Sequence, residues 1–344
     1  MKTDLAIIGQ GAVTPTGVGI EALFGRAPVE TPTSFLSRPE EQYPVYRVDL
    51  KDPALQRWQN EPRLRRASPI SYFLVEAASQ ALAEIDDAAR AQTGLIVAYS
   101  TGCLDYTRRL FQNVVTNGQK TASPALFPET VFNSPVSHVA ATLRLEGAAY
   151  ALIGDDTAWI AALKTAWLWL EQARVQQVLV LGVEEFDAAT LDAYRSARWL
   201  NRKGGEGPYV PAEGAAGVLI RKAQTGDTLR ISQMEEGFIH RTRAQARAAG
   251  ERCLREFDST LPAFRSAGRN WLGPIESDLL AERPALVSKV APYLGEASTA
   301  SAAWNTLRAL GELNPKTPRL LVPIWGTDHQ IGALQLEKQI APAD

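Results

Sequence analysis

The sequence contains few of the residues that build metal centres and disulfide frameworks. Among 344 residues there are two cysteines, Cys103 and Cys253, and three histidines, His138, His240 and His329. The cysteines lie in different segments without a C-x-x-C spacing, and the histidines are scattered along the chain. A chain of this size that lacks a disulfide framework is typical of a reducing compartment. We therefore expect a cytoplasmic protein with no zinc site.

Long apolar runs and an excess of one charge are also absent. No stretch approaches the roughly 20 apolar residues of a membrane span, and the apolar run in MKTDLAIIGQG is too short for a signal peptide. The formal net charge of −2 gives no general attraction to nucleic acid or to a membrane, so we expect neither as a partner. The densest basic cluster, Arg57 with Arg63, Arg65 and Arg66, is typical of a solvated helix start, with docking of an acidic partner as the alternative.

The chain does contain short apolar runs, bounded by glycine, that alternate with helical patterns. Such runs are typical of buried strands. They begin at Leu5, Gly94, Ala148, Gln177, Gly214, Leu229, Arg319 and Gly332. Their nearly unbroken apolar character favours a sheet covered on both faces. Strands that alternate with helices indicate an α/β layered fold.

The helix expected over residues 157–172 is apolar nearly all round, which predicts burial between two layers. Residues 27–60 are rich in proline and charge and are expected to form an insertion or surface loop, and NRKGGEGPY, from Asn201, another loop. The pattern of the first half, residues 1–225, is roughly echoed in a shorter second half, residues 226–344. This echo predicts two related halves.

Six segments resemble the β-ketoacyl synthases of the thiolase superfamily. These segments are AIIGQGAVTPTG, SPALFPETVFNSPVSHVAATLRLEG, VLVLGVEE, GPYVPAEGAAGVLIRK, SKVAPYLGEASTASAAWNTLRAL and PIWGTDHQIGALQLEK. They occur in the family's order and span almost the whole chain. The resemblance implies a five-layered α-β-α-β-α duplication, usually dimeric. It implies no cofactor.

The resemblance fails at the catalytic positions of the family. The catalytic Cys falls on Asp156, and the second catalytic His falls on Pro292. The first catalytic His belongs near GRNWLGPIESDLL, where Asn270 and Trp271 are the nearest matches. A chain without these groups is expected to have no condensing activity.

Two tryptophans replace small residues of the family pattern. Trp159 follows the nucleophile position, and Trp325 ends the triplet, with Pro323 and Ile324, that corresponds to a Gly-Phe-Gly gating loop. Both are expected to fill the acyl pocket, so that no elongated cavity reaches Asp156.

Asp156 has three interpretations. In the first, Asp155 or Asp156 caps the helix that begins at Thr157, a role worth about 0.5–2 kcal/mol. In the second, Asp156 is a catalytic carboxylate of a decarboxylase or acyl transferase. In the third, it contacts a ligand without chemistry.

These patterns favour a catalytically inactive protein that binds another protein. One version resembles a chain length factor, which forms a homodimer or a heterodimer with a ketosynthase homologue and meets acyl carrier protein. A second is a thiolase-fold adaptor or chaperone for a type VI secretion effector. In ketosynthase-like folds the helix expected from Leu104 crosses the dimer interface. The resemblance therefore assigns interface positions to Thr107, Leu110, Phe111 and Val114.

Overall fold

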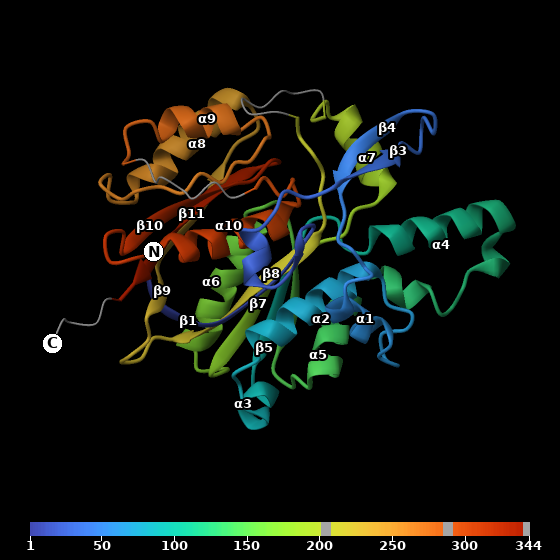
Figure 1. The fold of residues 1–344 in the computed structure, drawn as a ribbon, viewed down its shortest axis with the longest axis horizontal. Helices are drawn as coiled ribbons and strands as arrows, with labels where there is room; N and C mark the ends of the chain where they lie inside the picture. The colour runs from blue at the N-terminus through green and yellow to red at the C-terminus, as the bar shows by residue number, and fades with distance from the viewer. Residues whose placement is uncertain (201–207, 285–291, 340–344) are drawn as a thin grey trace.

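A mixed sheet runs through the molecule (Figure 1), which a computed structural model describes for residues 1–200, 208–284 and 292–339. Within these ranges the sheet has nine strands, eight of them in the order β10-β11-β9-β1-β8-β7-β5-β6, and the short β2 (Gly17–Val18) pairs with β1. The eight strands are β1 (Lys2–Thr14), β5 (Gly94–Tyr99), β6 (Ala149–Ile153), β7 (Gln177–Glu184), β8 (Gly214–Lys222), β9 (Leu229–Ile239), β10 (Arg319–Trp325) and β11 (Gln330–Lys338).

The strand pairings repeat between the two halves of the chain. In the first half, β8 lies between β7 and β1 and is antiparallel to both. In the second half, β11 lies between β10 and β9 and is likewise antiparallel to both. The first half adds β5 and β6, which are parallel to β7 and to each other. The two halves meet where β1 pairs with β9, and the predicted boundary at 225/226 falls in the connection before β9 and stays a prediction.

Helices complete five layers. The outer helices α2 (Pro69–Ala81) and α5 (Ser134–Leu143) cover the strands of the first half, and α8 (Arg243–Arg255) with α9 (Gly273–Leu279) covers those of the second. Between them, α6 (Ala158–Glu171) contacts strands of both halves, as does α10 (Ser298–Glu312). The predicted α-β-α-β-α order is therefore confirmed.

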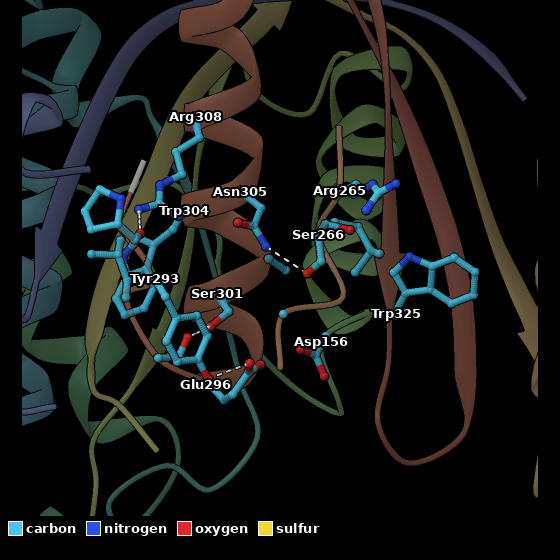
Figure 2. A pocket seen from close by; sticks show the side chains of 16 residues that line it. Asp156, Arg265, Ser266, Tyr293, Glu296, Ser301, Trp304, Asn305, Arg308 and Trp325 are labelled. Carbon is cyan, nitrogen blue, oxygen red and sulfur yellow. Dashed lines mark hydrogen bonds between the residues drawn. The ribbon is translucent and has the colours of Figure 1, made fainter. Parts of the chain in front are cut away.

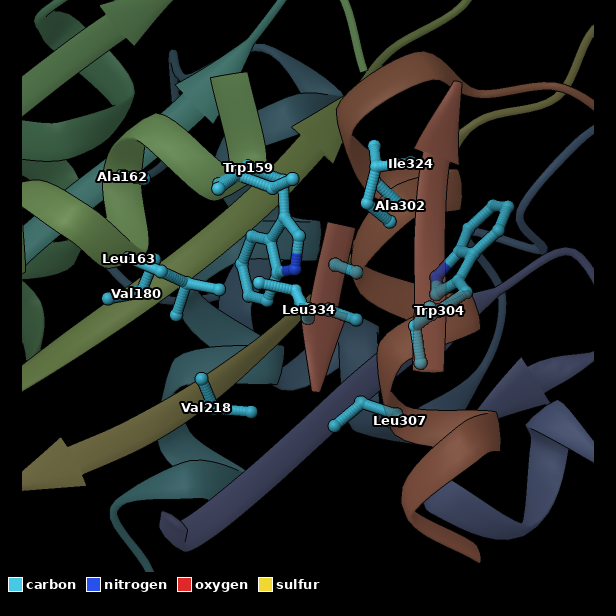
Figure 3. Close-up of a cluster of buried hydrophobic side chains, with 14 of the residues drawn as sticks. Trp159, Ala162, Leu163, Val180, Val218, Ala302, Trp304, Leu307, Ile324 and Leu334 are labelled. Carbon is cyan, nitrogen blue, oxygen red and sulfur yellow. The ribbon is translucent and has the colours of Figure 1, made fainter. Parts of the chain in front are cut away.

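The middle layer holds the bulkiest part of the core. Trp159 on α6 and Trp304 on α10 are almost fully buried among apolar side chains of both halves (Figure 3). The indole Nε1 of Trp159 donates to the hydroxyl of Thr306 at 2.9 Å, which ties α6 to α10. The prediction that this helix is buried between layers is confirmed, although Leu168 near its end is 41 % exposed.

The expectation for residues 27–60 was wrong in part. This stretch contains the hairpin of β3 (Glu30–Ser34) and β4 (Gln42–Tyr46), followed by α1 (Pro53–Gln59). Alternation of Thr, Tyr and Val favours the strands, and Asp52, whose carboxylate accepts from Ala54 N–H, starts the helix ahead of Pro53. The loop expected from Asn201 lies largely outside the described residues.

The remaining elements are η1 (Ile20–Leu23), α3 (Asp87–Ala91), α4 (Leu104–Asn117), η2 (Gln119–Thr121), η3 (Phe127–Thr130) and α7 (Ala188–Ser196). Every helix in the described ranges is too short or too polar to cross a bilayer.

Candidate functional site

The corner between β6 and α6 is closed by Asp155. Its carboxylate accepts hydrogen bonds from the N–H of Thr157 at 3.0 Å and from the Thr157 hydroxyl at 2.6 Å. The other oxygen accepts from the N–H of His329 at 3.1 Å. Gly326 passes so close that an added Cβ would lie 2.1 Å from the Asp155 carboxylate. Neither aspartate is the N-cap of α6, because Thr157 takes that position and makes no side-chain capping bond. Asp155 instead holds the turn just before α6 and also fastens the loop of residues 326–330.

Asp156 has a different environment. Asp156 is 9 % exposed, and its carboxylate lies 3.4 Å from both the N–H and the hydroxyl of Thr327. Burial, reinforced by the charge of Asp155, raises the pKa of Asp156 well above its ordinary value. The carboxylate form, which a nucleophile or a base needs, is therefore disfavoured relative to an exposed aspartate.

We expect Asp155 and Asp156 to respond oppositely to substitution. Asp155→Ala leaves the buried Thr157 N–H without an acceptor and frees the loop at His329, so it should cost about 2–4 kcal/mol in unfolding free energy. Asp156→Asn removes only a poorly bonded buried carboxyl and should leave stability unchanged or raised at neutral pH. Urea unfolding of both variants measures the difference. A larger loss in Asp156→Asn than in Asp155→Ala would contradict this assignment.

A cavity of about 200 Å³ opens beside Asp156 (Figure 2). Pro292 and Trp325 also line it, so three of the residues identified from the sequence meet at one place although they are far apart in the chain. A cavity does reach Asp156, whereas the prediction was that no elongated cavity does so; that prediction stays untested. Its volume is below the roughly 300 Å³ at which typical small-molecule sites begin.

Charged groups line this cavity without pairing with one another. Arg308 donates from its guanidinium to the carbonyl oxygens of Leu23 and Pro292, and burial lowers its pKa to about 10. Glu296 accepts from the Tyr293 hydroxyl at 2.8 Å, and burial raises its pKa to about 7. The described residues that line the cavity include no cysteine and no histidine.

The two tryptophans occupy different places. Trp325 borders the cavity, and its Nε1 donates to Glu276 of α9 at 2.7 Å. Glu276 also accepts from the N–H groups of Ser266 and Ala267, so the tryptophan that stands in the predicted gating triplet is tied to a fixed carboxylate. Trp159 lies in the core between α6 and α10 and is not among the residues that line the cavity.

The thiols and imidazoles lie elsewhere. His138 lies 2.9 Å from Glu129, and His240 is buried with Nε2 3.1 Å from the Gly326 carbonyl oxygen. Cys103 is 3 % exposed, and burial raises the pKa of its thiol to about 12. Cys253 has the same pKa shift for the same reason. No thiolate is favoured at either position.

The positions nearest to the first catalytic His of the family have structural roles. The Asn270 side chain accepts from the N–H of Leu272 at 2.8 Å, just before α9. The Trp271 ring stands edge-on to the His240 ring, with centroids 5.6 Å apart. Neither is among the residues that line the cavity.

The predicted interface helix α4 projects from the body of the molecule (Figure 1). Phe111 is 68 % exposed, Leu110 and Val114 are half-buried, and Thr107 donates its hydroxyl to the Cys103 carbonyl at 2.8 Å. Further exposed apolar side chains on or near this helix are Val115 and Phe127. The exposed residues of the helix are mixed, because Phe111 and Val115 are apolar whereas Thr107, Arg109 and Gln112 are polar. Two exposed apolar side chains therefore stand within a mostly polar outer face.

The strand β6 is an edge strand among the described strands. It is the last strand in the sheet order and pairs with β5 alone among the described strands. Tyr150 and Ile153 on it are 52 % and 56 % exposed. An exposed apolar edge of this kind is a ready site for pairing with another chain.

Sequence reasoning missed a set of buried carboxylates at the base of α4. They are Glu184, Glu185, Asp187 and Glu213. Glu184 accepts from the N–H and the hydroxyl of Thr101. Glu185 accepts from the N–H of Ile70, at the start of α2, and of Asp105, at the start of α4. One carboxylate therefore positions two helix starts.

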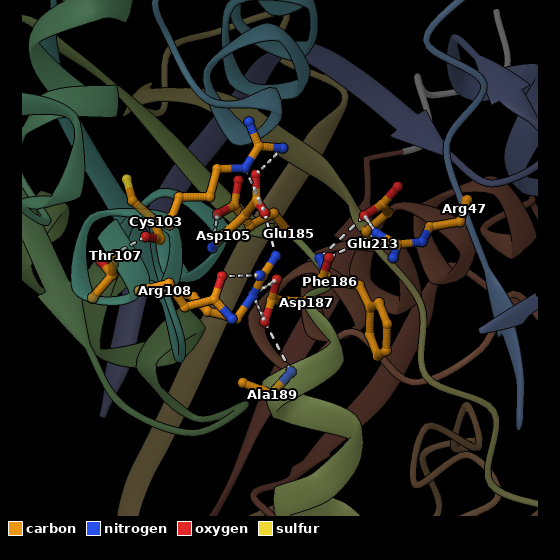
Figure 4. A network of polar contacts seen from close by, with 12 residues as sticks. Arg47, Cys103, Asp105, Thr107, Arg108, Glu185, Phe186, Asp187, Ala189 and Glu213 are labelled. Atoms are coloured by element: carbon orange, nitrogen blue, oxygen red, sulfur yellow. Dashed lines mark hydrogen bonds and ion pairs between the residues drawn. The ribbon is translucent and has the colours of Figure 1, made fainter. Parts of the chain in front are cut away.

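The other two carboxylates pair with arginines (Figure 4). Asp187 accepts from the Ala189 N–H, which caps α7, and from the Arg108 side chain of α4 at 2.8 Å. Glu213 pairs with Arg47 at 3.0 Å. The run EEFD directly after an apolar strand was the available sequence signal, because consecutive acidic residues at a buried strand end need such partners.

The buried carboxyls predict an unusual pH dependence of stability. Burial raises the pKa of Glu184 to about 7 and that of Glu185 to about 8. The unfolded chain releases these protons near its ordinary pKa of about 4.5, whereas the folded chain keeps them. The folded state then binds more protons, so unfolding free energy should fall as pH rises from about 5 to about 8. Urea unfolding across this range measures it, Glu185→Gln should flatten the slope, and rising stability would contradict it.

Within the described residues, no group of three or more His, Cys, Asp or Glu side chains is placed to hold a metal ion.

Comparison with known proteins identifies the family of the chain. The profile of the β-ketoacyl synthase N-terminal domain matches residues 38–225, more than half of the chain. The chain belongs to the β-ketoacyl synthase family. A search of the curated proteins gives no match.

Solved structures of this family share the fold over nearly the full length. The ishigamide ketosynthase/chain length factor is 21 % identical with a TM-score of 0.81, and the match covers 97 % of this chain and 99 % of that one. A type II PKS acyl-carrier protein in complex with its ketosynthase, AntDE:AntF, matches at 14 % identity and a TM-score of 0.73, over 98 % and 100 % of the two chains. A β-ketoacyl synthase from Burkholderia phymatum matches at 14 % and 0.72, over 99 % and 100 %.

Proposed function

We propose that this chain is a non-condensing member of the β-ketoacyl synthase family that pairs with a condensing ketosynthase, in the manner of a chain length factor. The observation that carries the proposal is the cavity beside Asp156, whose described lining offers neither thiol nor imidazole. Condensation at this corner needs a thiolate whose pKa is lowered and a base within hydrogen-bond reach. Asp156 has no thiol, and burial raises the pKa of its carboxyl, which disfavours the carboxylate that a base needs.

The second support is the retained pairing surface. The exposed apolar residue Phe111 lies on α4, the helix that the family resemblance assigns to the dimer interface, and β6 adds an exposed edge. Arg108 and Asp105 hold the base of α4 through Asp187 and Glu185, so the helix is built to keep its orientation. A chain that has lost catalytic groups and keeps a projecting helix with exposed apolar side chains fits a binding subunit.

The solved relatives suggest the partner class. One is described as a ketosynthase/chain length factor, and another as a ketosynthase in complex with an acyl-carrier protein. We therefore propose a heterodimer with an intact ketosynthase, which an acyl-carrier protein visits. A homodimer of this chain is the state expected when it is purified alone.

Two other functions have less support. A decarboxylase or acyl transferase that uses Asp156 needs the carboxylate form, which burial disfavours. An adaptor for a type VI secretion effector requires no particular chemistry at this cavity, and nothing in the site favours it.

Co-expression tests the proposal. We would express this chain with a tagged copy of each intact ketosynthase of its genome and assay the purified complexes for ketoacyl product from acyl and malonyl carrier-protein thioesters. We expect one ketosynthase to co-purify in equal amount, and to make a product whose chain length depends on this chain. Asp156→Asn in this chain serves as the matched control and should leave pairing and product unchanged. Failure of every ketosynthase to co-purify would contradict the proposal.

A further inference from the structure

A basic groove follows the outer face of α8, in the second half of the chain. Its volume is about 560 Å³, and the residues that line it include Arg241, Gln245, Ala248, Arg252 and Arg255. From Gln245 onward these residues are spaced by three and four, so they form one stripe along the helix. The buried residues of α8, such as Ala249 and Cys253, face the sheet instead. The groove therefore lies on the solvent-exposed side of α8, and the opposite side of this helix packs against the sheet.

The positive charge of this groove is not compensated. The side chains of Arg241, Arg252 and Arg255 form no ion pair and no hydrogen bond with any residue that the structure describes. The carboxylate in the groove, Glu251, lies 3.5 Å from Arg247, which also pairs with Asp278. Three arginines thus face one groove in a protein whose formal net charge is −2. Such a local excess attracts a segment of the opposite charge.

The groove also has an apolar contact point. Ile239, the last residue of β9, lines it and is 61 % exposed, and Ala248 on α8 is exposed beside the arginines. An apolar residue flanked by cations matches an amphipathic helix that carries acidic residues around an apolar face. The 13 residues of α8 extend about 20 Å, which suits about four turns of a bound helix. The phosphate backbone of a nucleic acid, in contrast, has no apolar group that could pack against Ile239.

We propose that this α8 groove is a docking site for an acidic amphipathic helix presented by a partner protein. In Figure 1, α8 and α4 lie at opposite ends of the molecule, so an occupant here leaves the proposed pairing helix free. The site therefore goes beyond the proposed function and does not depend on it. A chain that pairs through α4 keeps this groove available for a further component.

A peptide probe tests the site on the full chain. The probe is a fluorescein-labelled synthetic peptide of about five helical turns, with Leu along one face and Glu on both flanks, and its binding is followed by anisotropy. We expect saturable binding that weakens by about tenfold in the pair Arg252→Glu and Arg255→Glu and falls with added salt. Ile239→Ser should also weaken binding of the peptide, because it removes the apolar contact. The peptide with Lys in place of Glu should not bind.

The controls separate this groove from other basic surfaces. Arg26→Glu with Arg174→Glu makes the same charge change at two exposed arginines outside the groove and should leave peptide binding unchanged. If the glutamate pair at α8 does not fold, Arg252→Gln with Arg255→Gln removes the charges more gently, and circular dichroism reports folding. Three results would each overturn the proposal: no saturable binding, loss of binding in the Arg26 and Arg174 pair instead, or tighter binding of duplex DNA or polyphosphate than of the peptide.

Discussion

The variant Asp156→Cys is expected to show no condensing activity above background, although it places a thiol at the position that the sequence resemblance aligns with the family nucleophile. A thiol becomes a nucleophile when a neighbouring cation, base or helix N-terminus lowers its pKa. The corner offers the N-terminus of α6, and Arg265 and Arg308 line the cavity, but the described residues that line it include no imidazole to act as the base. Members of a nucleophile–base unit act together, and losing one costs on the order of 10⁶ in turnover, about as much as losing all.

The assay is the formation of ketoacyl product from acyl and malonyl carrier-protein thioesters, detected by mass spectrometry. An intact ketosynthase in the same mixture is the positive control and sets the scale of the expected difference. The unaltered chain should match the background rate as well. Product formed by Asp156→Cys above the reaction without protein would contradict the prediction, and product formed by the unaltered chain would end the non-condensing proposal.

Much of the fold could be predicted from the sequence, because the apolar patterns of its strands and of its central helix are strong. The apolar runs from Gln177 and Arg319 became β7 and β10, and the helix apolar on all sides became α6 between two layers. The hairpin at residues 30–46 was missed, because its prolines and charges outweigh the weak alternation of its Thr, Tyr and Val residues. Short exposed strands depend on packing against neighbours, here around Phe35 and Phe186, which a local pattern does not contain.

The sequence indicated which distant residues meet at the cavity, but it did not predict the charged side chains that line it. The resemblance brought Asp156, Pro292 and Trp325 to one place, as the cavity now has them. It did not predict Arg308 or Glu296, because on α10 and before it these residues look like ordinary polar positions. Their role comes from the meeting of distant segments, as when Arg308 reaches the carbonyl of Leu23. Trp159 was assigned to the pocket but packs in the core, since its indole points toward Thr306.

Phe111→Asp is expected to abolish pairing of this chain, either with itself or with a ketosynthase. Phe111 is 68 % exposed at the middle of α4, so the substitution should leave folding of the monomer intact. In an obligate interface, which buries more than about 2,000 Å², an aromatic anchor of this kind contributes about 2–4 kcal/mol. An aspartate there also buries an unpaired charge, so the affinity should fall by at least about a hundredfold.

Sedimentation velocity at micromolar protein measures this effect directly. Ile239→Asp is the matched control, because it also replaces an exposed apolar residue by aspartate, at the end of β9 and on neither α4 nor β6. It should leave the dimer intact, whereas Phe111→Asp should sediment as a monomer with the unfolding midpoint of the parent. If the unaltered chain is itself a monomer and binds no ketosynthase, or if Phe111→Asp pairs as tightly as Ile239→Asp, then α4 is not the pairing surface. In that case the exposed apolar residues of α4 would have to contact a different partner.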